Sequence, residues 1–205
     1  MDIDFEIGTQ IPDALPSGLS FEYYHGLKNR ELWLDTDVEL EEGVLAISRQ
    51  IIRWNREDKD LPVSKRRPIV LYCFSYGGDL DVCNSIIDLI KTSKTPVFGV
   101  NVGRCMSAAA YIFICCHKRF AFPHSYFLFH QGSGVVGGTA SEMKSQMDNY
   151  QRQVNELTTL MSENTKYSAE EIKKSITTEW YVNSNEAIAN GVCDKVVTSL
   201  DELIF

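Results

Sequence analysis

The sequence predicts an α/β fold built from parallel βαβ units, and three observations support this class. Two short apolar runs, 68–74 and 96–102, are bounded by proline or glycine, which is typical of buried strands. The segment between them repeats its apolar residues at helical spacing, at Val82, Ile86, Ile87 and Ile90. A nearly all-apolar run, 107–116, follows the second strand and is predicted to be a buried helix. Alternation of this kind implies parallel strands with right-handed crossovers.

Further elements flank this unit on both sides. Residues 31–35 are predicted to form a strand, and 38–55 contain a helix. The apolar face of that helix is expected to comprise Leu40, Val44, Ile47 and Ile51, widened by Leu45 and Ile52. Short strands are expected at 119–122 and 126–129, with a last strand in 193–199.

The C-terminal third is predicted to be largely helical. Thr139 and Glu142 form a capping-box pattern that begins a long helix reaching about residue 164. One apolar stripe follows that helix, at Met143, Met147, Tyr150, Val154, Leu157 and Met161. The capping pattern recurs at Ser168-x-x-Glu171 and Asn183-x-x-Glu186, and Gly191 is placed to end the last helix.

The chain length and its termini predict one main domain. Residues 1–20 contain prolines and glycines without periodicity and are expected to form a flexible N-terminal arm. The remaining residues, 21–205, are expected to form a single domain. The acidic N-terminus lacks the pattern of a signal peptide, and no apolar run reaches the ~20 residues of a membrane helix. These features predict a cytoplasmic protein without a membrane partner.

The charge and the cysteines exclude two further classes of function. A net charge of −8 argues against nucleic-acid binding, and the basic run 65–67 is interpreted as a solvated loop. The six cysteines show no C-x-x-C pair and no histidine at metal spacing, so buried reduced thiols are predicted and no metal site is expected. A cysteine nucleophile at Cys105 is the alternative.

The residues that could carry chemistry follow the predicted strands. Ser107 lies at a strand-to-helix junction, where free N–H groups favour anions, and His130 ends another apolar run. A base activates a serine hydroxyl, and N–H groups of Gly77 and Ala108 could stabilise an oxyanion. Each feature also has a structural interpretation: Ser107 as a helix N-cap, His130 as a packed imidazole and the Gly77-Gly78 pair as a turn. The residue types alone leave these alternatives open.

The order of the motifs along the chain resembles the ClpP family of caseinolytic serine peptidases. The run G-R-C-M-S-A-A-A (103–110) is similar to the family's G-x-A-A-S-M-G-A, and "FPHSYFLFHQGSGVVGG" is similar to its histidine motif. "SYGGDLDVCNSIID" resembles the S-P-G-G segment with its helix, and "WYVNSNEAIANGVCDKVV" the R-F-L-S ending. These similarities are collinear from about residue 24 to residue 198.

The resemblance implies a ClpP/crotonase-like spiral of βαβ units with a protruding handle helix at about 139–164. It makes Ser107 the nucleophile, His130 the general base, and Gly77 and Ala108 the oxyanion donors. It further implies heptameric rings stacked as a tetradecamer, an AAA+ Clp unfoldase as partner and unfolded polypeptides as substrates. ATP would be used by the unfoldase, so this chain is expected to need no cofactor.

The sequence departs from the family pattern near the site. The third catalytic residue is expected at Glu179, where the family has aspartate, with Thr178 and Asp194 as weaker candidates. Ala109, Cys105, Met106 and Tyr76 also differ from the usual residues. These changes leave a weakly active or structural subunit, in a mixed ring with a paralogue, as the main alternative. A crotonase-type acyl-CoA enzyme and a viral prohead protease are further alternatives within the same fold.

Overall fold

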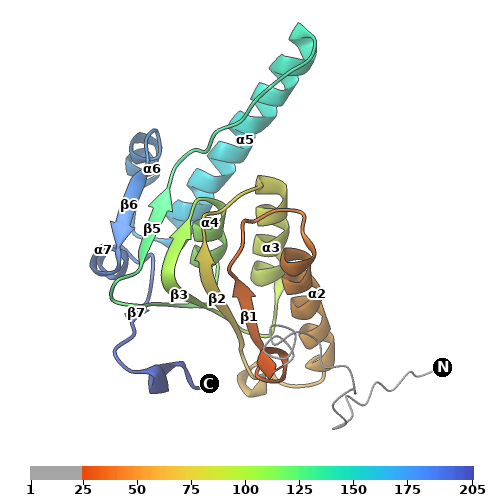
Figure 1. Ribbon diagram of the computed structural model, residues 1–205, viewed down its shortest axis with the longest axis vertical. Helices are drawn as coiled ribbons and strands as arrows, with labels where there is room; N and C mark the ends of the chain where they lie inside the picture. The colour runs from red at the N-terminus through yellow and green to blue at the C-terminus, as the bar shows by residue number, and fades with distance from the viewer. Residues whose placement is uncertain (1–24) are drawn as a thin grey trace, which may run out of the picture.

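The strands come together in one seven-stranded sheet in the computed structural model, which describes residues 25–205 (Figure 1). The predicted α/β class is therefore confirmed, whereas the predicted arm, residues 1–20, lies outside the described residues. All strand pairs are parallel except that of β5 with β6. The strands are β1 (Glu31–Leu34), β2 (Ile69–Ser75), β3 (Val97–Met106), β4 (Lys118–Ala121), β5 (Tyr126–Phe129), β6 (Trp180–Asn183) and β7 (Lys195–Val196).

The long strand β3 has different partners along its length. Its first half, from Phe98 to Asn101, pairs with β4, and its second half, from Arg104 to Met106, pairs with β5. The strand is longer than the predicted 96–102, because it continues through Gly103. Since β3 and β5 are parallel neighbours, the residues that follow them emerge at the same edge of the sheet.

The helices lie mainly against one face of this sheet (Figure 1). Every residue of α4 is buried, as its apolar composition predicts. The predicted buried face of α3 is also confirmed, at Val82, Ile86, Ile87 and Ile90. The helices are α2 (Glu42–Glu57), α3 (Leu80–Thr92), α4 (Ala108–Ile114), α5 (Ala140–Asn164), α6 (Ala169–Ser175) and α7 (Ser184–Ala189), with short 3₁₀ helices at Val63–Lys65 and Leu200–Leu203.

The prediction for α2 was wrong at two apolar positions. Leu40 precedes the helix and is exposed, and Ile52 points to solvent from the helix itself. Gln50 and Trp54 complete the buried face instead. Because α2 begins only at Glu42, the true buried stripe starts one turn later than the periodicity indicates.

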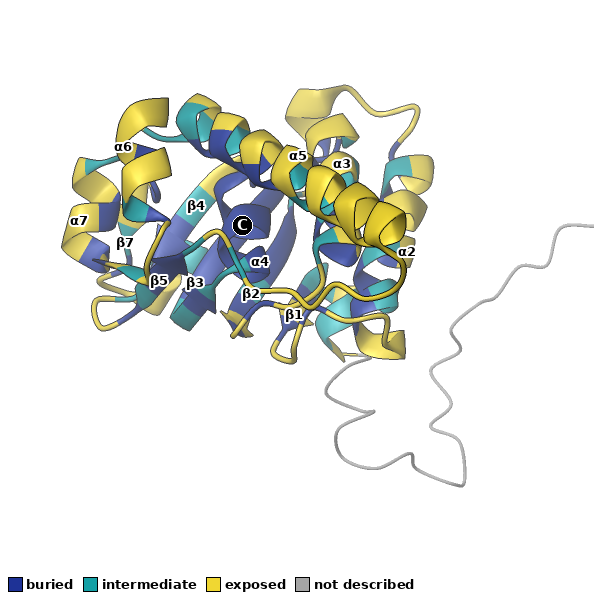
Figure 2. Cartoon of the chain, turned by 90° about the horizontal axis from the view of Figure 1, so that it is seen from above, coloured by how far each residue is buried: buried dark blue, intermediate teal, exposed yellow. Residues whose placement is uncertain are grey.

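The long helix α5 is anchored at one end only. The predicted capping box of Thr139 and Glu142 is present, and Val154 and Met161 are buried in the core. The outer half projects beyond the sheet, and Figure 2 shows it exposed. Met143 and Met147 are therefore exposed, so the predicted stripe is buried over only half its length. Helical periodicity identifies the apolar face, but it does not show how much of that face another element covers.

A buried ion pair ties the first strand to the base of α2. The Arg30 guanidinium donates two hydrogen bonds to the Asp58 carboxylate, at 2.6 and 2.7 Å, and Thr95 donates a third at 2.9 Å. Hydrogen bonds from Arg30 lower the pKa of Asp58, and they outweigh burial, which acts to raise it. Arg66, interpreted above as solvated, is in fact buried beside Thr95.

We expect Asp58→Asn to lower the free energy of unfolding by about 3 kcal/mol at pH 7, because it leaves the buried Arg30 without its counter-charge. The folded carboxyl has the lowered pKa, so its contribution is present above the unfolded value of about 3.9. It is lost as the pH falls further, and the difference between wild type and variant should shrink below about pH 4. Urea unfolding at several pH values measures this difference. Asp60→Asn is the control, since Asp60 is almost fully exposed; an equal effect there would contradict the assignment.

Candidate active site

Ser107 occupies a strained turn between β3 and α4. Its backbone has φ 51° and ψ −127°, a region that residues other than glycine seldom adopt. Its N–H donates to the Leu128 carbonyl at 2.8 Å, which ties the turn to β5. The Ser107 hydroxyl makes no capping hydrogen bond to α4. The N-cap interpretation therefore does not describe this side chain.

His130 follows directly after β5 and meets the serine. Its Nε2 lies 2.7 Å from the Ser107 Oγ, a distance at which the hydroxyl can donate to a neutral imidazole nitrogen. The next residue is held on both sides: the Gln131 N–H donates to the Ile176 carbonyl, and the Tyr150 hydroxyl donates to the Gln131 carbonyl. The structure thus brings together two predicted residues that are 23 positions apart in the chain.

The predicted oxyanion donors also lie at this turn. A Cβ on Gly77 would lie 2.6 Å from the Met106 carbonyl oxygen and 2.9 Å from the Ala108 nitrogen, so only glycine allows this approach. Ala108 is the first residue of α4, where N–H groups have no acceptor within the helix. The Gly77 N–H donates instead to the Ser75 hydroxyl at 3.1 Å. Binding of an oxyanion by Gly77 would therefore require this bond to be shared or exchanged.

The glycine turn is held from the other side by Val38. The Val38 N–H donates to the Gly77 carbonyl at 2.7 Å, and the Asp79 N–H donates to the Val38 carbonyl at 2.6 Å. At Gly78 a Cβ would lie only 2.4 Å from the Val38 oxygen. Both glycines have positive φ, so the pair is required by both space and backbone conformation.

Glu179, the predicted third residue, is close to His130 in register but bonded elsewhere. The antiparallel pairing joins Phe129 to Trp180, which places Glu179 opposite His130 at the next position. Its carboxylate accepts a hydrogen bond from the Tyr181 hydroxyl at 2.9 Å. Within residues 25–205, no ion pair or hydrogen bond joins it to His130.

The weaker candidate Asp194 is excluded by its own partner. Arg119 donates to both Asp194 carboxylate oxygens, at 2.7 and 3.3 Å, so this pair is structural. The exposed Thr178 makes no hydrogen bond to His130 among the contacts of the described residues. The sequence analysis missed Tyr181, because it did not recognise β6 as a strand. Alternation along "EWYV" was the available signal, since it places Glu179 and Tyr181 on the same face.

The cysteines are buried free thiols, as predicted. Cys105 donates from Sγ to the Ala109 carbonyl, and burial raises its pKa well above the ordinary value. It therefore lacks the thiolate that a nucleophile needs. Over the described part of the chain, no three metal-ligating side chains gather, and no helix is both long and apolar enough to cross a membrane.

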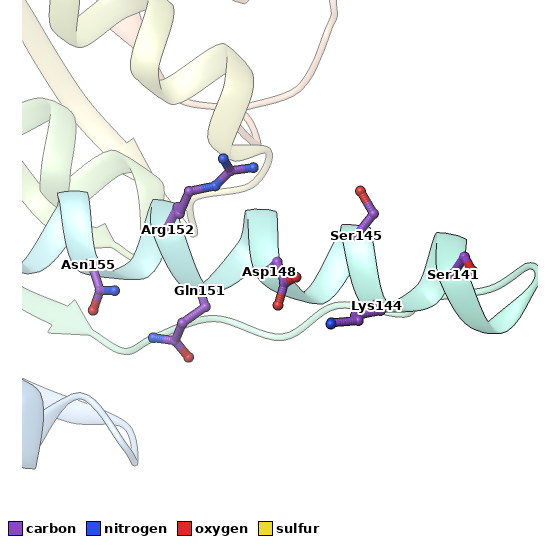
Figure 3. A pocket seen from close by; sticks show the side chains of 7 residues that line it. All are labelled: Ser141, Lys144, Ser145, Asp148, Gln151, Arg152 and Asn155. Atoms are coloured by element: carbon purple, nitrogen blue, oxygen red, sulfur yellow. The ribbon is translucent and has the colours of Figure 1, made fainter.

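A surface groove lies away from Ser107, along the outer part of α5 (Figure 3). All its lining side chains belong to that helix and are polar: Ser141, Lys144, Ser145, Asp148, Gln151, Arg152 and Asn155. None of the predicted catalytic residues contributes to it.

The fold and the site together define an α/β protein with a serine–histidine pair at the edge of a mainly parallel sheet. The model of the Clp protease family matches residues 25–200, and the chain therefore belongs to that family, which confirms the resemblance drawn from the motifs.

Relatives with this name span most of the chain. "ATP-dependent Clp protease proteolytic subunit 2" of Treponema pallidum is 26% identical over 191 residues, 91% of this chain and 92% of the relative. The protein of the same name from Corynebacterium diphtheriae is 29% identical over 179 residues, 86% of each chain. "ATP-dependent Clp protease proteolytic subunit" of Paracoccus denitrificans is 31% identical over 149 residues, 72% of each chain.

We expect Ser107→Gly to be more stable than Ser107→Ala by about 1–2 kcal/mol, because glycine removes the strain of a positive φ. Thermal or urea unfolding of the two variants measures the difference. The same pair at Ser85, inside α3, should show the opposite order, since glycine weakens a regular helix. Equal stability of both Ser107 variants would contradict the strain argument.

We expect Gly77→Ala to disrupt the turn itself. The added methyl group would meet the Met106 carbonyl and the Ser107 Cβ at 2.6 and 2.7 Å, so the backbone around the serine must move. The melting temperature should fall, and labelling of Ser107 by a fluorophosphonate should slow at least tenfold. Gly43→Ala is the control, because nothing lies within 4 Å of a Cβ there. Labelling at the wild-type rate would refute the close-approach argument.

Proposed function

We propose that this chain is a serine endopeptidase subunit of an ATP-dependent Clp-type protease. The observation that carries the proposal is the 2.7 Å contact between Ser107 Oγ and His130 Nε2 at a strained strand-to-helix turn. Strain of this kind persists only where the surrounding structure maintains it, and it is common at catalytic residues. The family match supports the same chemistry.

The proposed reaction proceeds through an acyl-enzyme. Ser107 Oγ attacks the carbonyl carbon of the scissile peptide bond while His130 Nε2 accepts the hydroxyl proton. The negative charge on the former carbonyl oxygen is stabilised by the N–H of Ala108, joined by that of Gly77 when its bond to Ser75 yields. The imidazolium then gives its proton to the leaving amine. Water, deprotonated by His130, hydrolyses the ester and restores the serine.

The assembly is part of the same proposal. The relatives are named proteolytic subunits of an ATP-dependent protease. We infer heptameric rings, stacked as a tetradecamer, that enclose the site in the cytoplasm and receive unfolded polypeptides from an AAA+ Clp unfoldase. The exposed Met143 and Met147 on the projecting half of α5 support contact with another copy, since this chain leaves them uncovered. ATP would be hydrolysed by the unfoldase, and this chain would use no cofactor.

A second candidate is a weakly active or structural subunit that works in a mixed ring with a paralogue. The hydrogen bond between Glu179 and Tyr181 favours it, because the carboxylate then does not orient the imidazole. Ser107→Ala would in that case alter assembly or the activity of the partner, without removing hydrolysis by this chain.

We expect a fluorophosphonate probe to label Ser107 in the purified, assembled protein at pH 7–8, where a neutral histidine is available. Intact mass and peptide mapping locate the adduct. Ser107→Ala should abolish labelling, and His130→Ala should reduce it at least a hundredfold, because the serine loses its base. Glu179→Ala tests the third residue. Absence of labelling in protein shown to form rings would favour the structural subunit.

A further inference from the structure

The register of β5 and β6 places three side chains on one face of the sheet. Leu128 pairs with Tyr181 and Phe129 with Trp180, so His130 is opposite Glu179, one position beyond the last pair. Residues directly opposite in an antiparallel pair have Cβ atoms about 4.5–5.5 Å apart. Glu179 is therefore within reach of His130 across the strands. Residues two apart on one strand share a face, so Tyr181 is equally near along β6.

The Glu179 carboxylate thus has two possible partners. The Nε2 of His130 is engaged by Ser107, which leaves Nδ1 as the ring atom that a carboxylate could orient. The Tyr181 hydroxyl donates to Oε2 of Glu179 at 2.9 Å instead. Its bond to Glu179 raises the pKa of Tyr181, so the phenol keeps its proton and stays a donor at neutral pH.

We propose that Tyr181 is a positioning residue that holds Glu179 away from His130, and that the Ser-His-Glu arrangement is completed when the carboxylate leaves the tyrosine. This inference rests on the proposed function of Ser107 and His130. The change is a rotation of one glutamate side chain that exchanges one hydrogen bond for another. Both Glu179 and Tyr181 are exposed, so solvent can compensate either group during the exchange.

The position of the carboxylate affects the transition state more than substrate binding. A carboxylate on Nδ1 stabilises the imidazolium that forms only as the serine attacks. An interaction made only in the transition state raises kcat and leaves KM unchanged. Removal of the Tyr181 hydroxyl should therefore increase activity, an effect that a purely structural role of the tyrosine would not produce.

The test compares Tyr181→Phe with wild type in the assembled protein. We expect the rate constant for fluorophosphonate labelling of Ser107, and kcat for a short peptide substrate, to rise about fivefold with KM unchanged, as for the loss of one competing hydrogen bond. Tyr126→Phe is the matched control: its ring packs 6.1 Å from that of Tyr181, but its hydroxyl does not bond Glu179. The Tyr126 variant should behave as wild type.

The double variant Tyr181→Phe, Glu179→Gln separates the carboxylate from other effects of the tyrosine. We expect it to lose the gain and match Glu179→Gln alone. A rate for Tyr181→Phe equal to or below wild type, or a gain that persists in the double variant, would overturn the inference while Ser107 is still labelled.

Crystal structures of wild type and Tyr181→Phe provide a readout independent of labelling. The Glu179 carboxylate should lie within hydrogen-bond distance of His130 Nδ1 in the variant, and its absence there would also overturn the inference. Failure of every variant to label Ser107, with the carboxylate bonded to His130, would reject the proposed peptidase function but support the role of Tyr181 in placing Glu179.

Discussion

The pairing of β3 with β5 over Arg104–Met106 determines where every part of the site lies. Because these strands are parallel neighbours, the residue after each one emerges at the same edge, and these residues are Ser107 and His130. The Ser107 N–H then bonds the Leu128 carbonyl and continues the same pairing into the turn. A shift of β5 by one residue would send His130 to the other face of the sheet, so the site depends on this register.

The site also depends on backbone that is held in unusual conformations. Ser107, Gly77 and Gly78 all have positive φ, and they contact each other or the neighbouring Val38. Hydrogen bonds from Val38 and to Leu128 keep these turns in place, which is how strained residues persist in a folded chain. The buried all-apolar helix α4 directly behind Ser107 provides the rigid support that such a turn needs.

Much of the fold could be predicted from sequence, because its elements carry local signals. The apolar spacing of α3 and the capping boxes at Thr139, Ser168 and Asn183 are read within a few residues, and the structure contains them all. The strand β6 was missed, because four residues with a single buried position give a weak alternation.

The candidate site was predictable to a smaller degree. Family motifs indicated Ser107 and His130, and the structure brings them together. The partner of Glu179 could not be predicted, because it depends on which way one side chain turns after the register of β5 and β6 is set. The exposure of Met143 likewise depends on tertiary coverage and not on helical periodicity.

The six buried thiols allow the opening of this chain to be followed chemically. Each one is shielded from solvent, and burial raises the pKa of Cys115 to about 12 and that of Cys193 to about 11. A thiol in this state reacts with an alkylating reagent only after its surroundings open and the thiolate forms. Cys193, which precedes the edge strand β7, and Cys105, beneath the nucleophile, lie in different parts of the fold. Their relative rates of alkylation would distinguish fraying of the sheet edge from global unfolding, without any added label.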